Sequence, residues 1–167
     1  MTFSEKISQS SDRPSDPRNQ EVVNPAETPA NGNLATPVNA SEFTKTLIGN
    51  LSVYREGLSI TRRGIEVGLA HGLIIYAPFA KLGPLRDTAS ANLIGLLSSI
   101  GLTVILTVTL LLYAASNPPA PTETITTPNP PKALATSQGW QEYAKGFFIG
   151  SLVGAGVSYL VVSLLGI

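Results

Sequence analysis

Residues 89–115 read ASANLIGLLSSIGLTVILTVTLLLYAA, a run without a charged side chain. At about 1.5 Å per residue, a helix of about 20 apolar residues crosses the roughly 30 Å hydrocarbon layer of a bilayer. A second apolar run, GFFIGSLVGAGVSYLVVSLLGI, covers residues 146–167. A third, GIEVGLAHGLIIYAPFA at residues 64–80, is interrupted only by Glu66 and His71. The sequence therefore predicts an all-α membrane protein with three transmembrane helices.

The composition excludes several classes of protein. The chain has 167 residues, a formal net charge of zero and no cysteine. Because it has no run of basic residues, we expect no nucleic acid partner. Without cysteine, a disulfide framework and a thiol nucleophile are excluded. About half of the chain is polar tail and loop, so the remainder is too small to enclose a water-excluding core, and lipid must take its place.

We divide the chain into three parts. Residues 1–43 are polar and rich in proline, which predicts an extended or disordered amino-terminal segment without a cleaved secretory signal. Residues 44–63 are partly amphipathic and are predicted to follow the cytoplasmic surface of the membrane. Residues 64–167 form the three-helix transmembrane domain. Its loop at residues 117–131 contains six prolines and must be extended.

The helix ends carry recognisable signals. Pro78 should kink the first span or end it within a few residues. Asp87 or Thr88 is expected to cap the second helix by accepting hydrogen bonds from its first amides. Thr136 or Ser137 is expected to open the last helix.

The orientation in the membrane follows from the basic residues near the spans. With the amino terminus in the cytoplasm, six of them lie on the cytoplasmic side and two on the opposite side, which favours this orientation. The six are Lys45, Arg55, Arg62, Arg63, Lys132 and Lys145, and the two are Lys81 and Arg86. Trp140 and Tyr143 then stand where an interfacial aromatic belt is expected.

His71 is the only histidine, and it lies eight residues after Arg63 and ten before Lys81. This spacing places it about 12 to 15 Å from either boundary, near the middle of the bilayer. One interpretation is a neutral imidazole that is hydrogen-bonded between helices. The other is an axial ligand to the metal of a porphyrin or chlorin, with the second ring nitrogen held by an acceptor.

Glu66 lies five residues before His71, roughly 140° away around a helix, so the two cannot act together on one face. This separation disfavours a proton relay. The carboxylate either pairs with Arg62 or Arg63 at the interface or ligates a second magnesium. From the spacing alone, the two interpretations are equal.

Small residues recur every four positions in all three spans. Such faces allow helices, or a flat macrocycle, to approach the backbone closely. For the last span we expect helix packing, whereas for Gly68 and Gly72 room for a bound ring is as plausible. The small residues are Gly64, Gly68 and Gly72, then Ala91, Gly95 and Ser99, then Gly146, Gly150 and Gly154.

No catalytic constellation is present in the sequence. There is no second histidine for a triad or a metal cluster, and no glycine-rich phosphate loop. The sequence therefore predicts a protein that is not an enzyme.

Several stretches together resemble one family. They are NLSVYR at 50–55, RRGIEVGLAHG at 62–72, PFAKLGPLRD at 78–87, ANL at 91–93, GW at 139–140 and GFFIG at 146–150. In these stretches the chain resembles photosystem I reaction-centre subunit XI, the L subunit, over residues 34–165.

The resemblance implies a three-helix subunit of the cyanobacterial thylakoid membrane that binds antenna chlorophyll a, β-carotene and lipid. Glu66 and His71 match the family's chlorophyll ligands. Pro84 and Asp87 match positions that hold calcium on the lumenal side in trimeric complexes, so calcium is a further candidate. The implied partners are the core and small subunits of photosystem I and the L subunits of neighbouring monomers. The carboxyl terminus would lie in the lumen.

Leu73 and Tyr76 depart from the residues common in the family beside the histidine, and the resemblance does not fix a dimer, trimer or tetramer. Two functions from other classes compete with a pigment-binding subunit. One is a small proton-coupled carrier or channel that uses Glu66 and His71. The other is a purely structural oligomerisation module.

Overall fold

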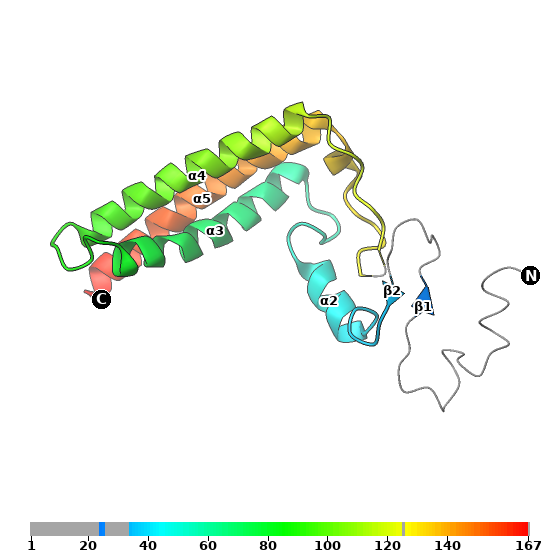
Figure 1. Cartoon of the computed structure of the whole chain (residues 1–167), viewed down its shortest axis with the longest axis horizontal. Helices are drawn as coiled ribbons and strands as arrows, with labels where there is room; N and C mark the ends of the chain where they lie inside the picture. The colour runs from blue at the N-terminus through cyan, green and yellow to red at the C-terminus, as the bar shows by residue number, and fades with distance from the viewer. Residues whose placement is uncertain (1–23, 26–33, 125, 167) are drawn as a thin grey trace, which may run out of the picture. The chain divides into compact units, whose positions relative to one another are not determined.

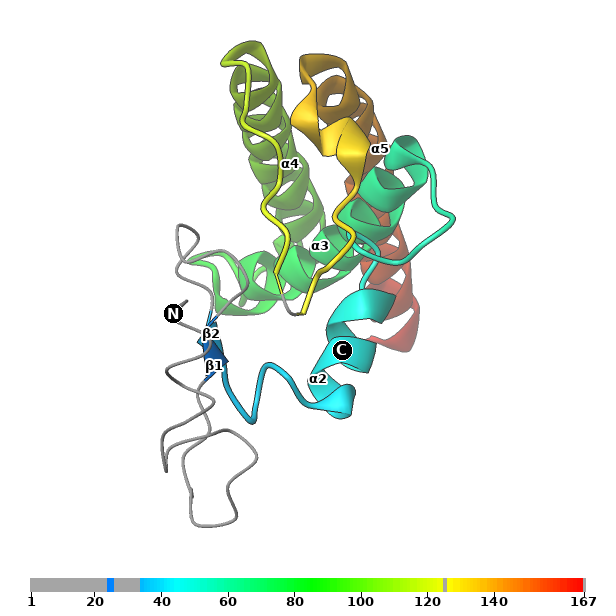
Figure 2. The same cartoon turned by 90° about the vertical axis from the view of Figure 1, so that its right-hand side faces the viewer.

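The computed structural model describes residues 24–25, 34–124 and 126–166. The chain divides into two compact units, one of residues 1–54 and 122–130 and the other of residues 55–121 and 131–167. The second unit holds three long helices that pack side by side (Figures 1 and 2), α3 (Ile60–Leu82), α4 (Ala91–Ala115) and α5 (Ser137–Leu165). All three are long and apolar enough to cross a membrane. The predicted all-α fold with three spans is confirmed.

The first unit contains one helix, α2 (Glu42–Asn50), among its described residues, and a pair of two-residue strands. The strands β1 (Asn24–Pro25) and β2 (Leu34–Ala35) are antiparallel. Ser41 caps α2, because its hydroxyl accepts from the amide of Thr44 at 3.2 Å. Most of the predicted extended segment 1–43 lies outside the described residues. The position of residues 44–63 on the membrane surface stays a prediction.

The helix α3 begins four residues before the apolar run that predicts it. Ser59 is its N-cap and accepts from the amide of Arg62 at 3.3 Å. Arg62 and Arg63 therefore belong to the first turn of α3 instead of preceding it. Pro78 lies inside the helix, which continues to Leu82.

The predicted cap of α4 is wrong. The helix begins at Ala91 after Ser90, whose side chain makes no capping hydrogen bond. Thr88 instead donates its hydroxyl to the carbonyl of Leu85 at 2.7 Å, within the turn. The Asp87 carboxylate lies 3.5 Å from Nε of Arg86. Both side chains therefore have partners within the turn and do not cap the first amides of α4.

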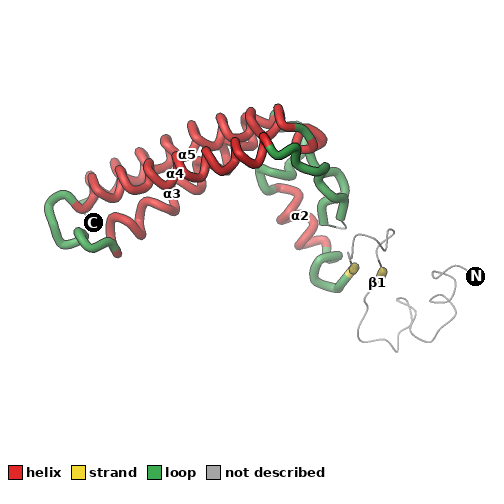
Figure 3. The backbone as a smooth tube through the Cα atoms, turned by 45° about the horizontal axis from the view of Figure 1, so that its top comes forward, coloured by secondary structure: helices red, strands yellow, loops and turns green. Residues whose placement is uncertain are grey.

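The connection from α4 to α5 is a loop, drawn green in Figure 3, and it ends in a 3₁₀ turn, η2 (Lys132–Ala135). Thr136 opens α5, as predicted: its Oγ1 accepts from the amide of Gly139 at 3.0 Å. Trp140 donates from Nε1 to the carbonyl of Leu134 at 2.7 Å. Its ring packs edge-on against Tyr113 of α4 and Tyr143 of α5, with centroids 4.9 and 5.6 Å apart.

The closest contact in the bundle joins α3 to α5 through glycines on both helices. A Cβ on Gly68 would lie 2.9 Å from Cα of Phe147, and a Cβ on Gly150 would lie 2.8 Å from the amide nitrogen of Leu69. The partner positions rise together along both chains, so α3 and α5 are parallel. Backbone meets backbone here, as small residues at a spacing of four allow. The glycines in this contact are Gly64, Gly68, Gly72, Gly146, Gly150 and Gly154.

The helix α4 also uses its small residues toward the bundle. Ala91, Gly95, Ser99 and Thr103, four positions apart, are all buried. A Cβ on Gly95 would lie 2.9 Å from Cα of Ala80 on α3. Large aliphatic side chains point outward instead, and Leu112 is 67% exposed. This distribution suits a bundle whose surroundings are lipid or other apolar surfaces rather than water.

Candidate functional site

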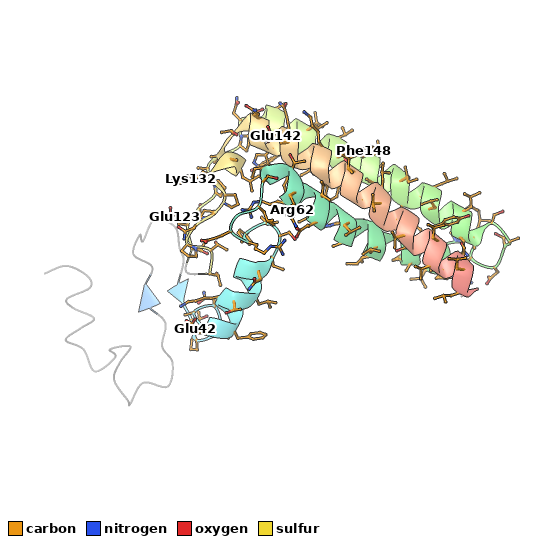
Figure 4. All side chains as sticks on the ribbon, turned by 180° about the vertical axis from the view of Figure 1, so that it is seen from behind. Glu42, Arg62, Glu123, Lys132, Glu142 and Phe148 are labelled. Carbon is orange, nitrogen blue, oxygen red and sulfur yellow. The ribbon has the colours of Figure 1, made fainter. Side chains whose placement is uncertain are left out.

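Glu66 forms an ion pair with two arginines. Its Oε1 accepts from Nε of Arg62, one helical turn earlier, at 3.3 Å, and its Oε2 accepts from the guanidinium of Arg55. The pairing with Arg62 is one of the two expected from the sequence. Figure 4 labels Arg62 near the amino-terminal end of α3. The sequence does not predict Arg55 as a partner, because it lies eleven residues away and no helical spacing points to it.

The turn before α3 brings Arg55 back to Glu66. Gly57 has a φ of 77°, a left-handed conformation that glycine adopts without steric cost. Arg63 then fixes the same segment, since its Nε donates to the carbonyl of Leu58 at 3.2 Å. The Arg63 side chain is buried in the protein, with only 6% of the residue exposed. The segment 55–59 is therefore linked to the first two turns of α3 at two points, through Glu66 and through Arg63.

The His71 side chain lies beside the contact between α3 and α5 and is exposed. Its Nδ1 lies 2.8 Å from the carbonyl oxygen of Val67. Because a carbonyl can only accept, this bond makes Nδ1 the donor, and a neutral ring then carries its lone pair on Nε2. The ring also packs edge-on against Phe147 of α5, with centroids 5.3 Å apart and planes at 68°. Both contacts fix the orientation of the imidazole.

The arrangement suits a metal held by one axial nitrogen. In the described part of the chain, no group of three or more histidine, aspartate or glutamate side chains could hold a bare metal ion. A magnesium chlorin needs no such group, because its macrocycle supplies four nitrogens and leaves an axial position for the protein. The exposed imidazole of His71 fits this need, with the Val67 carbonyl as the outer partner that metal-ligating histidines commonly have.

Gly68 and Gly72 lie close to His71 in sequence, and both face the backbone of α5. A Cβ on Gly72 would lie 2.7 Å from the amide nitrogen of Ala155 on α5, and a Cβ on Gly68 would be similarly close to Phe147. Both glycines are buried against α5. They therefore serve contact between the helices, and the alternative of room for a ring on their own face does not hold.

Pro84 and Asp87 lie in the exposed turn between α3 and α4. Calcium takes six to eight oxygen ligands, typically several of them carboxylates. This turn supplies one carboxylate, which lies beside the guanidinium of Arg86. The donor set of this chain does not fit calcium by itself.

The comparisons with known proteins agree with one another. The family model described as photosystem I reaction centre subunit XI matches residues 21–167. The chain belongs to this family. It is 53% identical to photosystem I reaction center subunit XI of Mastigocladus laminosus over 162 residues, which cover 96% of this chain and 94% of that protein.

Two further relatives carry the same description. The subunit XI of Nostoc punctiforme is 54% identical over 167 residues, 99% of this chain and 96% of that protein. The subunit XI of Synechococcus elongatus is 52% identical over 146 residues, 86% of this chain and 88% of that protein. The chain is thus a non-catalytic subunit of the photosystem I reaction centre, as the sequence predicts.

Proposed function

We propose that this subunit XI holds chlorophyll a through His71 and Glu66, and that its outer helix faces contact β-carotene, lipid, the photosystem I core and the subunit XI of a neighbouring monomer. The observation that carries the proposal is the exposed imidazole of His71, fixed through Nδ1 so that Nε2 offers its lone pair. The bound chlorophyll supplies the light absorption and excitation transfer.

The protein contributes the position of the pigment. The bond from Nδ1 to Val67 and the edge-on contact with Phe147 hold the ring against α3 and α5. Because these two helices meet through their backbones, they form a rigid support for the ligand. Glu66 would bind a chlorophyll through a carboxylate oxygen, at a position nearer the amino-terminal end of α3.

The positions of Glu66 and His71 on α3 argue against a proton-coupled carrier. A proton-coupled carrier would need Glu66 and His71 to exchange a proton, but they lie roughly 140° apart on the helix. Glu66 is held by Arg55 and Arg62 instead. Pro84 and Asp87 can enter a calcium site only if a neighbouring copy of the chain or water supplies the remaining oxygen ligands. We propose the amino terminus on the cytoplasmic side, from the six basic residues against two.

The test replaces the ligand and counts pigment. We expect photosystem I that carries His71→Leu to contain one chlorophyll fewer while it keeps the subunit. The substitution leaves no buried polar group without a partner, because His71 is exposed and its bond is to its own helix.

The matched control is Ile74→Leu, one helical turn away on α3 and 71% exposed, which should keep every chlorophyll. The measurements are chlorophyll per complex by extraction, a density map of the purified complex, and the amount of subunit by mass spectrometry. A full chlorophyll count in complexes that contain the His71→Leu subunit contradicts the proposed ligand.

A further inference from the structure

The ion-paired carboxylate of Glu66 joins two segments of the chain. Arg62 comes from α3 itself, and its side chain is 68% exposed. Arg55 comes from the segment before the helix, and its side chain is 38% exposed, against 26% for Glu66. Exposed ion pairs contribute little because water screens them, so Arg55 is the stronger of the two partners.

The position of Arg55 is fixed by contacts of its own segment. The left-handed turn at Gly57 reverses the chain, and the bond from Arg63 to the carbonyl of Leu58 ties this segment to α3. The first turn of α3 is itself capped by Ser59. Arg55 therefore approaches Oε2 from outside the helix, while Arg62 approaches Oε1 along it.

Such a carboxylate differs from one that faces water. A guanidinium that binds one oxygen orients the carboxyl plane and withdraws negative charge from it. Groups that bind a metal ligand from outside the coordination sphere orient that ligand and tune its basicity. The charge beside a chlorophyll and the strength of its axial ligand both affect the energy at which it absorbs.

We propose that Arg55 is a positioning residue for the chlorophyll that Glu66 ligates, and that it sets both the direction of the carboxylate and the absorption energy of that pigment. This inference rests on the proposed role of Glu66 as a ligand. It adds to that role a residue outside the three spans, delivered by the turn at residues 55–59.

The experiment uses whole photosystem I complexes with substitutions at Arg55 and Glu66. The readouts are chlorophyll per complex and the low-temperature absorption difference spectrum against the unmodified complex. In Arg55→Gln we expect the full number of chlorophylls and a shift of one band, with the amplitude of a single pigment. Arg55→Lys keeps the charge and should give a smaller shift, and Arg62→Gln, at the more exposed partner, should also give a smaller shift.

Double variants separate tuning from a general disturbance. The Arg55→Gln shift should disappear in a Glu66→Gln background, because the two residues act on one pigment, and should persist in a His71→Leu background. Loss of one chlorophyll in Arg55→Gln that Arg55→Lys restores also supports the proposal. A flat difference spectrum, a shift that survives Glu66→Gln, or a loss that Arg55→Lys does not restore overturns it.

The same set of variants distinguishes a failure of the proposed function from a failure of the proposed role of Arg55. If Glu66→Gln alone keeps every chlorophyll and leaves the spectrum unchanged, Glu66 is not a ligand, and the proposed function fails at that position. If Glu66→Gln changes the pigment while Arg55→Gln changes nothing, Glu66 stays a ligand and only the role of Arg55 is refuted.

Discussion

The backbone contact between α3 and α5 makes Gly150→Ala a sharp test of the fold. A Cβ at Gly150 would lie 2.8 Å from the carbonyl carbon of Ile65 and 2.8 Å from the amide nitrogen of Leu69, whereas ordinary Cβ contacts are 3.4 to 4 Å. These neighbours belong to the main chain of α3 and cannot turn away as a flexible side chain can. The carbonyl oxygen of Ile65 would lie closer still, so the two helices must separate by more than roughly 0.6 Å in a close-packed seam.

Overpacking of this kind costs about 1 to 3 kcal/mol. Since rigid backbone is involved, we expect a cost of about 3 kcal/mol, which corresponds to about a hundredfold change in an equilibrium constant. The assay heats purified photosystem I in steps and follows the release of the subunit on native gels. Gly150→Ala should be released at a lower temperature than the unmodified subunit.

Two other glycines serve as matched controls. At Gly101 in α4 and Gly156 in α5, an added Cβ would meet no atom of the described chain within 4 Å. Replacement by alanine at either position carries the same gain in helix propensity, up to about 1 kcal/mol, without the steric cost. Both should be released at or above the normal temperature. If Gly150→Ala behaves like these two variants, the close contact between α3 and α5 is refuted.

Two further predictions concern the ends of the helices. Thr136→Ala should destabilise the start of α5 by about 1 kcal/mol, because the hydroxyl caps the amide of Gly139, whereas Ser90→Ala before α4 should have no effect, because that side chain makes no cap bond. Trp140→Phe should keep the two edge-on ring contacts but lose the hydrogen bond to the carbonyl of Leu134, at a cost of about 0.5 to 1.5 kcal/mol. Thermal release of the subunit measures all three variants, and equal release temperatures for Thr136→Ala and Ser90→Ala would contradict the assigned caps.

The three spans are predictable from the sequence because their length and lack of charge are local properties. The start of α5 is predictable for a similar reason, since Thr136 reaches an amide only three residues ahead. The start of α4 is not, because the Thr88 hydroxyl can accept from an amide of α4 or donate to the carbonyl of Leu85, and the sequence does not show which hydrogen bond it makes.

The candidate site shows the same limit. The spacing of Glu66 allows an ion pair with Arg62 or Arg63, because three or four residues is about one turn of a helix, and the structure has the pair with Arg62. The pairing with Arg55 depends on a left-handed turn at Gly57, and helical spacing carries no information about a partner across such a turn. At Gly68 and Gly72 the sequence predicts a close approach to the backbone but leaves open whether a helix or a bound ring makes it, whereas the structure places the backbone of α5 there.

The parallel pairing of α3 and α5 has a consequence for biogenesis. About 80 residues separate the paired glycines in the chain, so at a synthesis rate of 5 to 20 residues per second α3 waits roughly 4 to 16 seconds for its partner. During that interval the glycine face of α3 and the ring of His71, which later packs against Phe147 of α5, are both open to the bilayer. The ring that we propose as a pigment ligand is therefore uncovered for several seconds before the last helix has inserted.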